Sequence, residues 1–393
     1  AQKRHCIEGA YRKKRKAHGK VEDAVMTVEA QTKNQRIFVT DCEGPISKND
    51  NAFELTSHLV LNGDQFFALI SKYDDVLADV VKKPGYKAGD TLRLILPFLK
   101  AYGATNGQIK EYSSRNILLV PGAGDTLRFV KDIMPSFIVS TSYEQYISSL
   151  CNLIGFPYDN VYCTKLDIDK YEMDEKEASK LRKIREEISA MEMIEIPENA
   201  RSVHDFSKRD QETVRRLDEI FWEEIPKMES GKMLKEVNPV GGYEKAKAVQ
   251  DIVEKLDSRL DKVMYVGDSI TDVPPFQLVR KNGGLTISFN GNEYAIREAE
   301  IAVLSGNTIV TSVLAEVFSR VGKDHVIKLV EEWSPSGLKK YCATPMLRET
   351  MLKLYPHAFP HVEMITANNR ERLKKESSAF RKTVRGEAIG KLG

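Results

Sequence analysis

Two apolar runs in this sequence end abruptly in a carboxylate, and this pattern constrains the fold more than any other feature. Residues 36–40 lead directly into Asp41, and residues 262–267 lead into Asp268. Runs of this kind are typical of buried strands. A third run, Phe137–Ser140, ends in a hydroxyl group. Because open parallel sheets carry their chemistry at the carboxyl ends of the strands, the sequence predicts an α/β protein with a Rossmann-like parallel sheet and a polar site along one edge.

Composition is that of a large globular protein. The 393 residues are 41% hydrophobic, and 59 Lys and Arg nearly balance 57 Asp and Glu. A net charge of +2 gives no overall attraction to nucleic acid or to an anionic membrane, so a nucleic-acid partner is not expected. The sequence contains neither an apolar run of membrane-spanning length nor the apolar core of a secretion signal, which predicts no membrane span and a cytoplasmic location. The five cysteines are scattered and odd in number, which predicts reduced thiols.

Changes of pattern along the chain indicate how it is organised. The basic run Arg12–Lys16 lies in a stretch without apolar periodicity, whereas glycine-punctuated helical periodicity after the first strand predicts a lid. Opposite charges three and four residues apart predict a second, exposed helical insertion further along. The predicted parts are a basic N-terminal arm (1–35), a core (36–50 and 116–365) with a charged helical insertion (about 165–240), a helical cap (51–115) and a polar C-terminal tail that frays (366–393).

Four short segments in a fixed order carry the candidate chemistry. They are Asp41-Cys-Glu43-Gly after the first strand, Ser140 at the end of another, Glu244-Lys245 at a predicted helix start, and Gly267-Asp268-Ser-Ile-Thr-Asp272. In order and residue type these segments resemble the motifs of the haloacid dehalogenase superfamily of phosphohydrolases, most closely its phosphoserine-phosphatase-like branch. The overall layout is also similar to a group of archaeal haloacid-dehalogenase-like proteins, some of which are labelled subunit R of an energy-converting hydrogenase.

The resemblance implies a role for each motif residue. Asp41 would be the nucleophile that attacks phosphorus, and Glu43 would be the general acid and base. Ser140 would donate a hydrogen bond to a phosphoryl oxygen, and Lys245 would offset the negative charge on the nucleophile and the phosphoryl group. Lys247 is an alternative to Lys245 as the motif lysine.

The resemblance also implies a magnesium site. Asp41, the carbonyl group of Glu43, and Asp268 form an oxygen-only set of ligands, which suits Mg2+. Asp272 would either bind the metal through water or hold Lys245 in place. The implied substrate is a small phosphorylated metabolite.

One residue departs from the family pattern and keeps other functions open. Pro45 stands where the family usually has Thr, Ser or Val, and proline lacks a backbone donor that would help to hold phosphate. The leading hypothesis is a Mg2+-dependent phosphatase of small phosphomonoesters that forms an aspartyl-phosphate. The alternatives are an accessory or regulatory subunit with little or no hydrolytic activity, which would contact a protein partner through the basic arm or the charged insertion, and a phosphotransferase to an acceptor alcohol.

Overall fold

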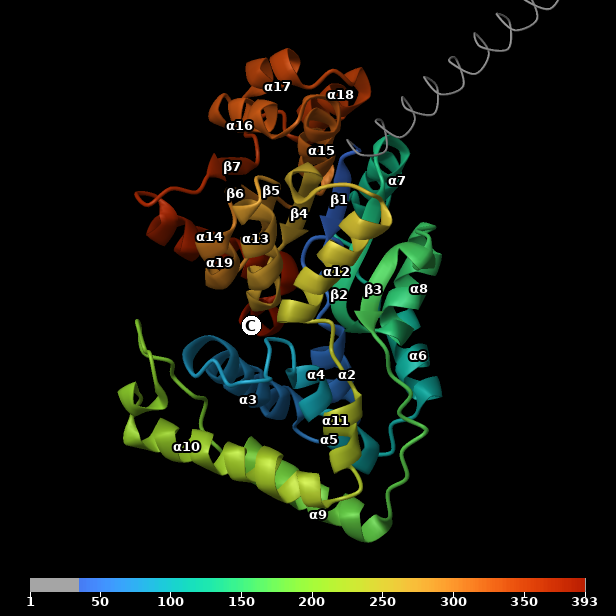
Figure 1. The fold of residues 1–393 in the computed structure, drawn as a ribbon, viewed down its shortest axis with the longest axis vertical. Helices are drawn as coiled ribbons and strands as arrows, with labels where there is room; N and C mark the ends of the chain where they lie inside the picture. The colour runs from blue at the N-terminus through green and yellow to red at the C-terminus, as the bar shows by residue number, and fades with distance from the viewer. Residues whose placement is uncertain (1–34, 393) are drawn as a thin grey trace, which may run out of the picture.

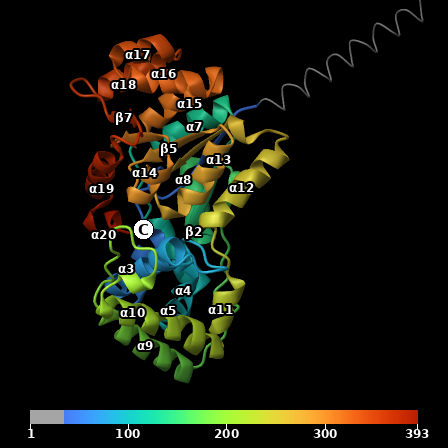
Figure 2. The same ribbon diagram turned by 60° about the vertical axis from the view of Figure 1, so that its left-hand side comes forward.

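The computed structural model describes residues 35–392. The basic arm predicted for residues 1–35 lies outside this range except for Gln35. A sheet with helices on both faces forms one half of the molecule, and a group of helices forms the other (Figure 1). The turned view in Figure 2 shows the same two halves.

The core contains a seven-stranded sheet with strand order β3-β2-β1-β4-β5-β6-β7. Strands β1 to β6 pair in parallel, and β7 joins β6 antiparallel at the edge. This mostly parallel sheet confirms the predicted α/β, Rossmann-like fold class. The strands are β1 (Ile37–Thr40), β2 (Ser136–Tyr143), β3 (Val161–Thr164), β4 (Val263–Gly267), β5 (Leu285–Phe289), β6 (Ile301–Leu304) and β7 (His361–Met364).

Because successive side chains of a strand point to opposite faces of the sheet, they pack into two separate hydrophobic layers. In β1, Phe38 packs into one layer, whereas Ile37 and Val39 pack into the other. The first layer is covered by α7 (Ala123–Ile133), α8 (Glu144–Ile154), α15 (Ile309–Val321), α16 (Lys323–Glu331), α17 (Pro335–Tyr341) and α18 (Pro345–Leu354). The second is covered by α12 (Gly242–Lys255), α13 (Val273–Lys281), α14 (Glu293–Glu298) and α19 (Arg370–Arg385).

The helices of the other half come from two separate stretches of sequence but share one hydrophobic cluster. The first stretch gives α2 (Asn51–Leu59), α3 (Gly63–Asp75), α4 (Thr91–Leu94), α5 (Leu96–Ala101) and α6 (Asn106–Arg115); the second gives α9 (Glu175–Ser189), α10 (Lys208–Glu219) and α11 (Gly231–Glu236). Although α9 is rich in charge, it buries Leu181, Ile184 and Ile188 on one face. We refer to this shared group of helices as the cap.

Short helical turns complete the described chain. They are the π-helical turns η1 (Val76–Val80) and η4 (Ile220–Glu224), and the 3-10 turns η2 (Tyr158–Asn160), η3 (Val203–Asp205), η5 (Ile225–Lys227), η6 (Leu260–Lys262) and η7 (Ile270–Asp272). Within residues 35–392, no helix combines the length and apolar character needed to cross a bilayer.

The C-terminal segment differs from the fraying polar tail predicted for residues 366–393. Residues 370–385 form α19, and α20 (Glu387–Gly390) follows it. The helix is held because four residues spaced four apart, Leu373, Ser377, Arg381 and Arg385, are all buried. Three of these buried residues are polar, so the polar composition of the segment does not mean that it is exposed. Helix α19 therefore belongs to the core and reaches the region where core and cap meet (Figures 1 and 2).

Candidate active site

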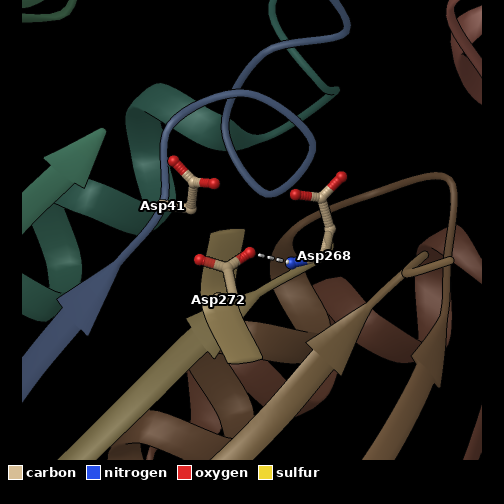
Figure 3. A group of neighbouring side chains, drawn as sticks. All are labelled: Asp41, Asp268 and Asp272. Atoms are coloured by element: carbon tan, nitrogen blue, oxygen red, sulfur yellow. Dashed lines mark hydrogen bonds between the residues drawn. The ribbon is translucent and has the colours of Figure 1, made fainter. Parts of the chain in front are cut away.

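Two neighbouring strands of the sheet deliver three aspartates to one point. Asp41 follows β1, and Asp268 and Asp272 follow β4, the strand that pairs with β1. Each of the three can place a carboxylate oxygen within 4.8 Å of the others, and all three side chains are buried. Figure 3 shows Asp41 and Asp268 on either side of this point, with Asp272 hydrogen-bonded to the main-chain nitrogen of Asp268. The predicted polar edge of the sheet is thus a compact acidic cluster.

Lys245 connects two of these aspartates. It lies near the start of α12, its side chain is 0% exposed, and its Nζ lies 2.6 Å from Oδ2 of Asp41 and 2.8 Å from Oδ1 of Asp272. Lys247, the alternative motif lysine, is exposed and pairs with Glu244 on the same helix. The structure therefore places Lys245, and not Lys247, beside Asp41.

Asp272 uses both oxygens to hold its surroundings together. Its Oδ1 accepts hydrogen bonds from Lys245 and from the hydroxyl of Tyr265 at 2.8 Å each. Its Oδ2 accepts from the main-chain nitrogens of Asp268 at 2.8 Å and Ser269 at 3.0 Å. Because these bonds occupy both oxygens, the geometry favours Asp272 as the residue that positions Lys245 over Asp272 as a metal ligand.

Glycine at position 44 allows the loop after Asp41 to approach Asp268. Gly44 has a φ of +104°, which side-chain-bearing residues rarely adopt, and a Cβ atom there would lie 2.1 Å from Oδ2 of Asp268. Both the backbone conformation and the close approach thus require glycine. The motif Asp41-Cys-Glu43-Gly ends in glycine for a geometric reason that the sequence alone does not show.

Glu43 lies two residues beyond Asp41, and its carboxylate turns toward the cap. Its Oε1 accepts a hydrogen bond of 2.6 Å from the main-chain nitrogen of Asn51, at the start of α2. Burial of the carboxyl group and the nearby charge of Asp50 raise the pKa of Glu43 well above its ordinary value. A raised pKa favours the protonated form of the carboxyl group, which suits a general acid.

Burial and charge act in opposite directions on the pair Asp41 and Lys245. Burial raises the pKa of Asp41 to about 7, although the Lys245 ammonium group favours the charged carboxylate. Burial by itself would lower the pKa of Lys245, but the carboxylates of Asp272 and Asp41 outweigh it and raise that pKa above its usual value. Lys245 is therefore a permanent positive charge next to Asp41.

A small cavity of about 90 Å³ opens beside Asp41. Asp41, Glu43 and Asp268 line it from the core, and Asp74 and Asp75 line it from α3 of the cap. A larger cavity of about 670 Å³ is lined by cap residues and shares Ser71, Asp75 and Leu392 with the small one. The small cavity is therefore much the narrower of the two.

Ser140 is placed differently from what the motif implied. It is buried near the carboxyl end of β2, its Oγ accepts a hydrogen bond of 3.2 Å from the nitrogen of Ser142, and it does not line the small cavity. The next two residues, Thr141 and Ser142, do line it. Ser140, Thr141 and Ser142 all carry a hydroxyl group. Their position at the end of a strand does not show which of them faces the cavity.

Four buried polar atoms on cavity-lining residues have no hydrogen-bond partner within residues 35–392. They are Oδ1 of Asp75, Oγ1 of Thr141, Oγ of Ser142 and Nε of Arg381. We call these four residues the outer wall of the site, and Asp41, Lys245, Tyr265 and Asp272 the inner wall. Because buried polar groups in native proteins are almost always paired, the outer wall is suited to a polar ligand.

Sequence reasoning missed two arginines that reach the site from α19. Arg381 and Arg385 both line the small cavity, and both contact Oδ2 of Asp268. They are 3% and 8% exposed, respectively. Their spacing of four residues, in line with Leu373 and Ser377, was the available signal, because it puts all four residues on one helix face.

The chemistry of the donors fits a hard divalent cation. Asp41, Asp268 and the main chain at Glu43 offer only oxygen atoms, which Mg2+ prefers. A bound Mg2+ would offset the negative charge between these carboxylates and a phosphate group. The arginine contacts on Asp268 reduce the net negative charge available to such a cation.

Fold and site together define a class: an α/β protein with a Rossmann-like core, an acidic, lysine-containing site at the carboxyl edge of its sheet, and a helical cap. The family model described as haloacid dehalogenase-like hydrolase matches residues 127–312. This match agrees with the resemblance of the sequence motifs to the haloacid dehalogenase superfamily.

The chain is also similar to solved structures. The structure of gene product AF1437 from Archaeoglobus fulgidus is 28% identical, covers 92% of this chain and 99% of its own, and superimposes with a TM-score of 0.74. An aspartyl-phosphate analogue complex of phosphoserine phosphatase is 13% identical, with coverage of 69% and 93% and a TM-score of 0.40. A substrate-bound phosphoserine phosphatase is 13% identical, with coverage of 72% and 98% and a TM-score of 0.39. No curated protein matches the sequence.

Proposed function

We propose that this protein is a Mg2+-dependent phosphohydrolase of small phosphomonoesters that works through an aspartyl-phosphate at Asp41. The observation that carries the proposal is the contact of the buried Lys245 with both Asp41 and Asp272. A carboxylate that is to approach an anionic phosphate needs a fixed positive charge beside it, and Lys245 supplies that charge.

The residues divide the chemistry into two steps. First, a carboxylate oxygen of Asp41 attacks phosphorus, the bond from phosphorus to the ester oxygen breaks, and Glu43 gives its proton to the leaving alcohol. Second, Glu43 takes a proton from water, the resulting hydroxide attacks phosphorus, and the bond to Asp41 breaks to release inorganic phosphate. The raised pKa of Glu43 suits its role in the first step.

The two cavities indicate what kind of molecule fits. The small cavity of about 90 Å³ suits the phosphoryl group, and the larger cavity of about 670 Å³ that adjoins it can take the rest of a small substrate. Asp50, Asp74 and Asp75 lie on the cap side of the small cavity and make that side acidic. We propose the hydroxyls of Thr141 and Ser142, together with Ser140, as candidates for the donor to a phosphoryl oxygen.

Release of phosphate from p-nitrophenyl phosphate and a panel of small phosphomonoesters tests the proposal, with Mg2+ and with EDTA. We expect metal-dependent turnover in the wild type and none in Asp41→Asn, which keeps the size of the side chain but removes the nucleophilic charge. Asp125→Asn is the matched control, because Asp125 is exposed and lies outside the site. Equal activity of Asp41→Asn and wild type would refute the mechanism.

A second function is favoured by a specific feature of the loop and of α19. Pro45 gives the loop one N–H donor fewer, and two arginines already contact Asp268. Both features would slow hydrolysis, and this favours an accessory or regulatory subunit of this fold. Folded wild-type protein without activity on any phosphoester, recovered with a stable protein partner, would favour this function. Turnover that increases when an alcohol is added as acceptor would instead favour phosphotransfer.

A further inference from the structure

The two arginines of α19 differ in how many of their hydrogen-bond donors are used. Arg385 is fully engaged: Nε donates to the carbonyl of Lys48 at 3.0 Å, Nη2 donates to the carbonyl of Asn49, and Nη1 lies 3.1 Å from Oδ2 of Asp268. It therefore fixes the chain just after the nucleophile loop to the strand end that carries Asp268. Arg385 is a positioning residue.

Arg381 uses fewer of its hydrogen-bond donors than Arg385 does. Its Nη1 contacts Oδ2 of Asp268 and lies 3.3 Å from the carbonyl oxygen of the same residue, but its Nε is buried and has no partner among the described residues. The side chain is 3% exposed and lines the small cavity beside Asp41. A guanidinium group with a buried free donor, held in place by a carboxylate, is well prepared to bind an oxyanion.

The loop after Asp41 leaves few main-chain donors for such an anion. The nitrogen of Cys42 donates to Asp41 itself at 2.7 Å, that of Gly44 donates to the carbonyl of Ser47 at 2.7 Å, and those of Ile46 and Ser47 both donate to the carbonyl of Cys42 at 2.9 Å. Pro45 has no N–H group. A donor from outside the loop would therefore have to supply some of the hydrogen bonds to the anion that these amides cannot supply.

Charge at the centre of the site is compatible with an incoming anion. Three buried carboxylates, those of Asp41, Asp268 and Asp272, are in contact with three cations, Lys245, Arg381 and Arg385. Their formal charges cancel. Without the two arginines the same cluster would carry a net negative charge and repel a phosphate dianion.

We propose that Arg381 binds an oxyanion of the substrate, either the phosphoryl group or a carboxylate next to it, and that Arg385 holds the nucleophile loop and Asp268 in the arrangement that permits this. The substrate class rests on the proposed phosphohydrolase function, but the anion site itself can be tested without turnover.

The first experiment measures binding of inorganic phosphate and of malonate to wild type and Arg381→Lys by calorimetry. Lysine keeps the positive charge but loses the planar fork and the Nε–H donor, so we expect about a ten-fold weaker Kd for at least one of the two anions. Weaker phosphate binding assigns Arg381 to the phosphoryl group, and weaker malonate binding alone assigns it to a carboxylate. Unchanged binding of both anions would overturn the proposal.

Two further variants separate anion binding from a structural role. Arg372→Lys is the matched control, since Arg372 lies on the same helix and pairs with Glu363 and Glu376 at the surface. It should bind both anions as the wild type does. If Arg381→Lys does not fold, Arg381→Gln, which keeps an N–H donor but no charge, is measured with the same expectation. A loss of thermal stability without any loss of anion affinity would reduce Arg381 to a structural role and refute the proposal.

Kinetics connect the anion site with catalysis. In an active enzyme, Arg381→Lys should raise KM for a phosphomonoester by about ten-fold and change kcat much less. No turnover in the wild type would refute the phosphohydrolase, yet the calorimetric result would still decide whether Arg381 binds an oxyanion. Failure of the proposed function and failure of this inference are thus distinguishable.

Discussion

The inner and outer walls of the site differ in how completely their polar groups are paired. On the inner wall, Asp272 alone accepts four hydrogen bonds, and Lys245 contacts two carboxylates. On the outer wall, Asp75, Thr141, Ser142 and Arg381 each keep one buried atom without a partner among the described residues. The inner wall is therefore preorganised before any ligand binds, whereas the outer wall is completed by what it binds.

Removing the cation of the inner wall should have the largest effect. Lys245→Met leaves the buried Asp41 and Asp272 without their shared counter-ion, so we expect kcat/KM to fall about a thousand-fold and the free energy of unfolding to fall by about 3–5 kcal/mol. Phosphate release and urea denaturation measure the two effects. Lys247→Met is the control, because Lys247 is exposed on the same helix. Similar behaviour of the two variants would contradict the distinction between the lysines.

A methyl group between the nucleophile loop and Asp268 should have the next largest effect. In Gly44→Ala the added Cβ collides with Asp268, and the positive φ adds strain of about 1–2 kcal/mol. Gly103→Ala isolates the strain, because Gly103 also has a positive φ but a Cβ there would meet nothing within 4 Å. We expect activity to be lost only in Gly44→Ala, with the larger loss of stability. Equal losses in both variants would show that the contact with Asp268 has no importance.

Metal binding should stabilise the protein through Asp268. At a concentration about one hundred times its Kd, Mg2+ should add about 2.7 kcal/mol to the free energy of unfolding of the wild type. Thermal unfolding with Mg2+ and with EDTA measures this gain as a shift in Tm. We expect Asp268→Asn to lose the shift and the surface variant Asp125→Asn to retain it. A full shift in Asp268→Asn would place the metal elsewhere.

Removing one bond from the fully paired inner wall should have a modest effect. Tyr265→Phe deletes the hydroxyl that donates to Asp272, while Lys245 and two main-chain nitrogens still hold that carboxylate. We expect a loss of about 1 kcal/mol in the free energy of unfolding and less than about a ten-fold loss of kcat. Tyr243→Phe, at an exposed position, is the control. A loss as large as that of Lys245→Met would mean that Tyr265 has a direct role.

A pH dependence is expected next to the outer wall. Burial raises the pKa of Asp74 from 3.8 to about 8. Because the folded state then binds a proton that the unfolded state has released, this group stabilises the fold fully below about pH 4, and the stabilisation is lost as pH rises through about 8. Asp74→Asn stays uncharged, so its free energy of unfolding should fall less than that of the wild type between about pH 5 and pH 9. Parallel pH profiles in urea denaturation would contradict this assignment.

The three aspartates at the centre of the site could be found in the sequence because each is tied to a local pattern, whereas Tyr265 of the inner wall was not predicted. Asp41 and Asp268 directly follow apolar runs, and Asp272 follows four residues later. A strand end in a parallel sheet places the next side chain at a common edge whatever the rest of the chain does. The choice of Lys245 over Lys247 needed the structure, since both lie on one helix and only its orientation buries one of them.

Residues of the outer wall could not be assigned in the same way. The stripe Leu373, Ser377, Arg381 and Arg385 was present in the sequence, but arginine at helical spacing is most often a solvated face. Its neighbours come from α3 and β2, about 300 and 240 residues away along the chain. The two helical stretches of the cap posed the same problem, because their shared hydrophobic cluster depends on packing between distant segments.

The sequence by itself determined the α/β class and predicted the edge of the sheet where the site lies, with Asp41, Asp268 and Asp272 as its acidic candidates. These follow from local rules: apolar runs form buried strands, and the residues after parallel strands meet at one edge. The family resemblance added Glu43 and a choice between Lys245 and Lys247. Only the tertiary structure decided that helix α19 brings Arg381 and Arg385 to Asp268 and that Asp75 and Thr141 share the cavity. The physical reason is that long-range packing, and not local pattern, sets which face of a helix meets which strand end.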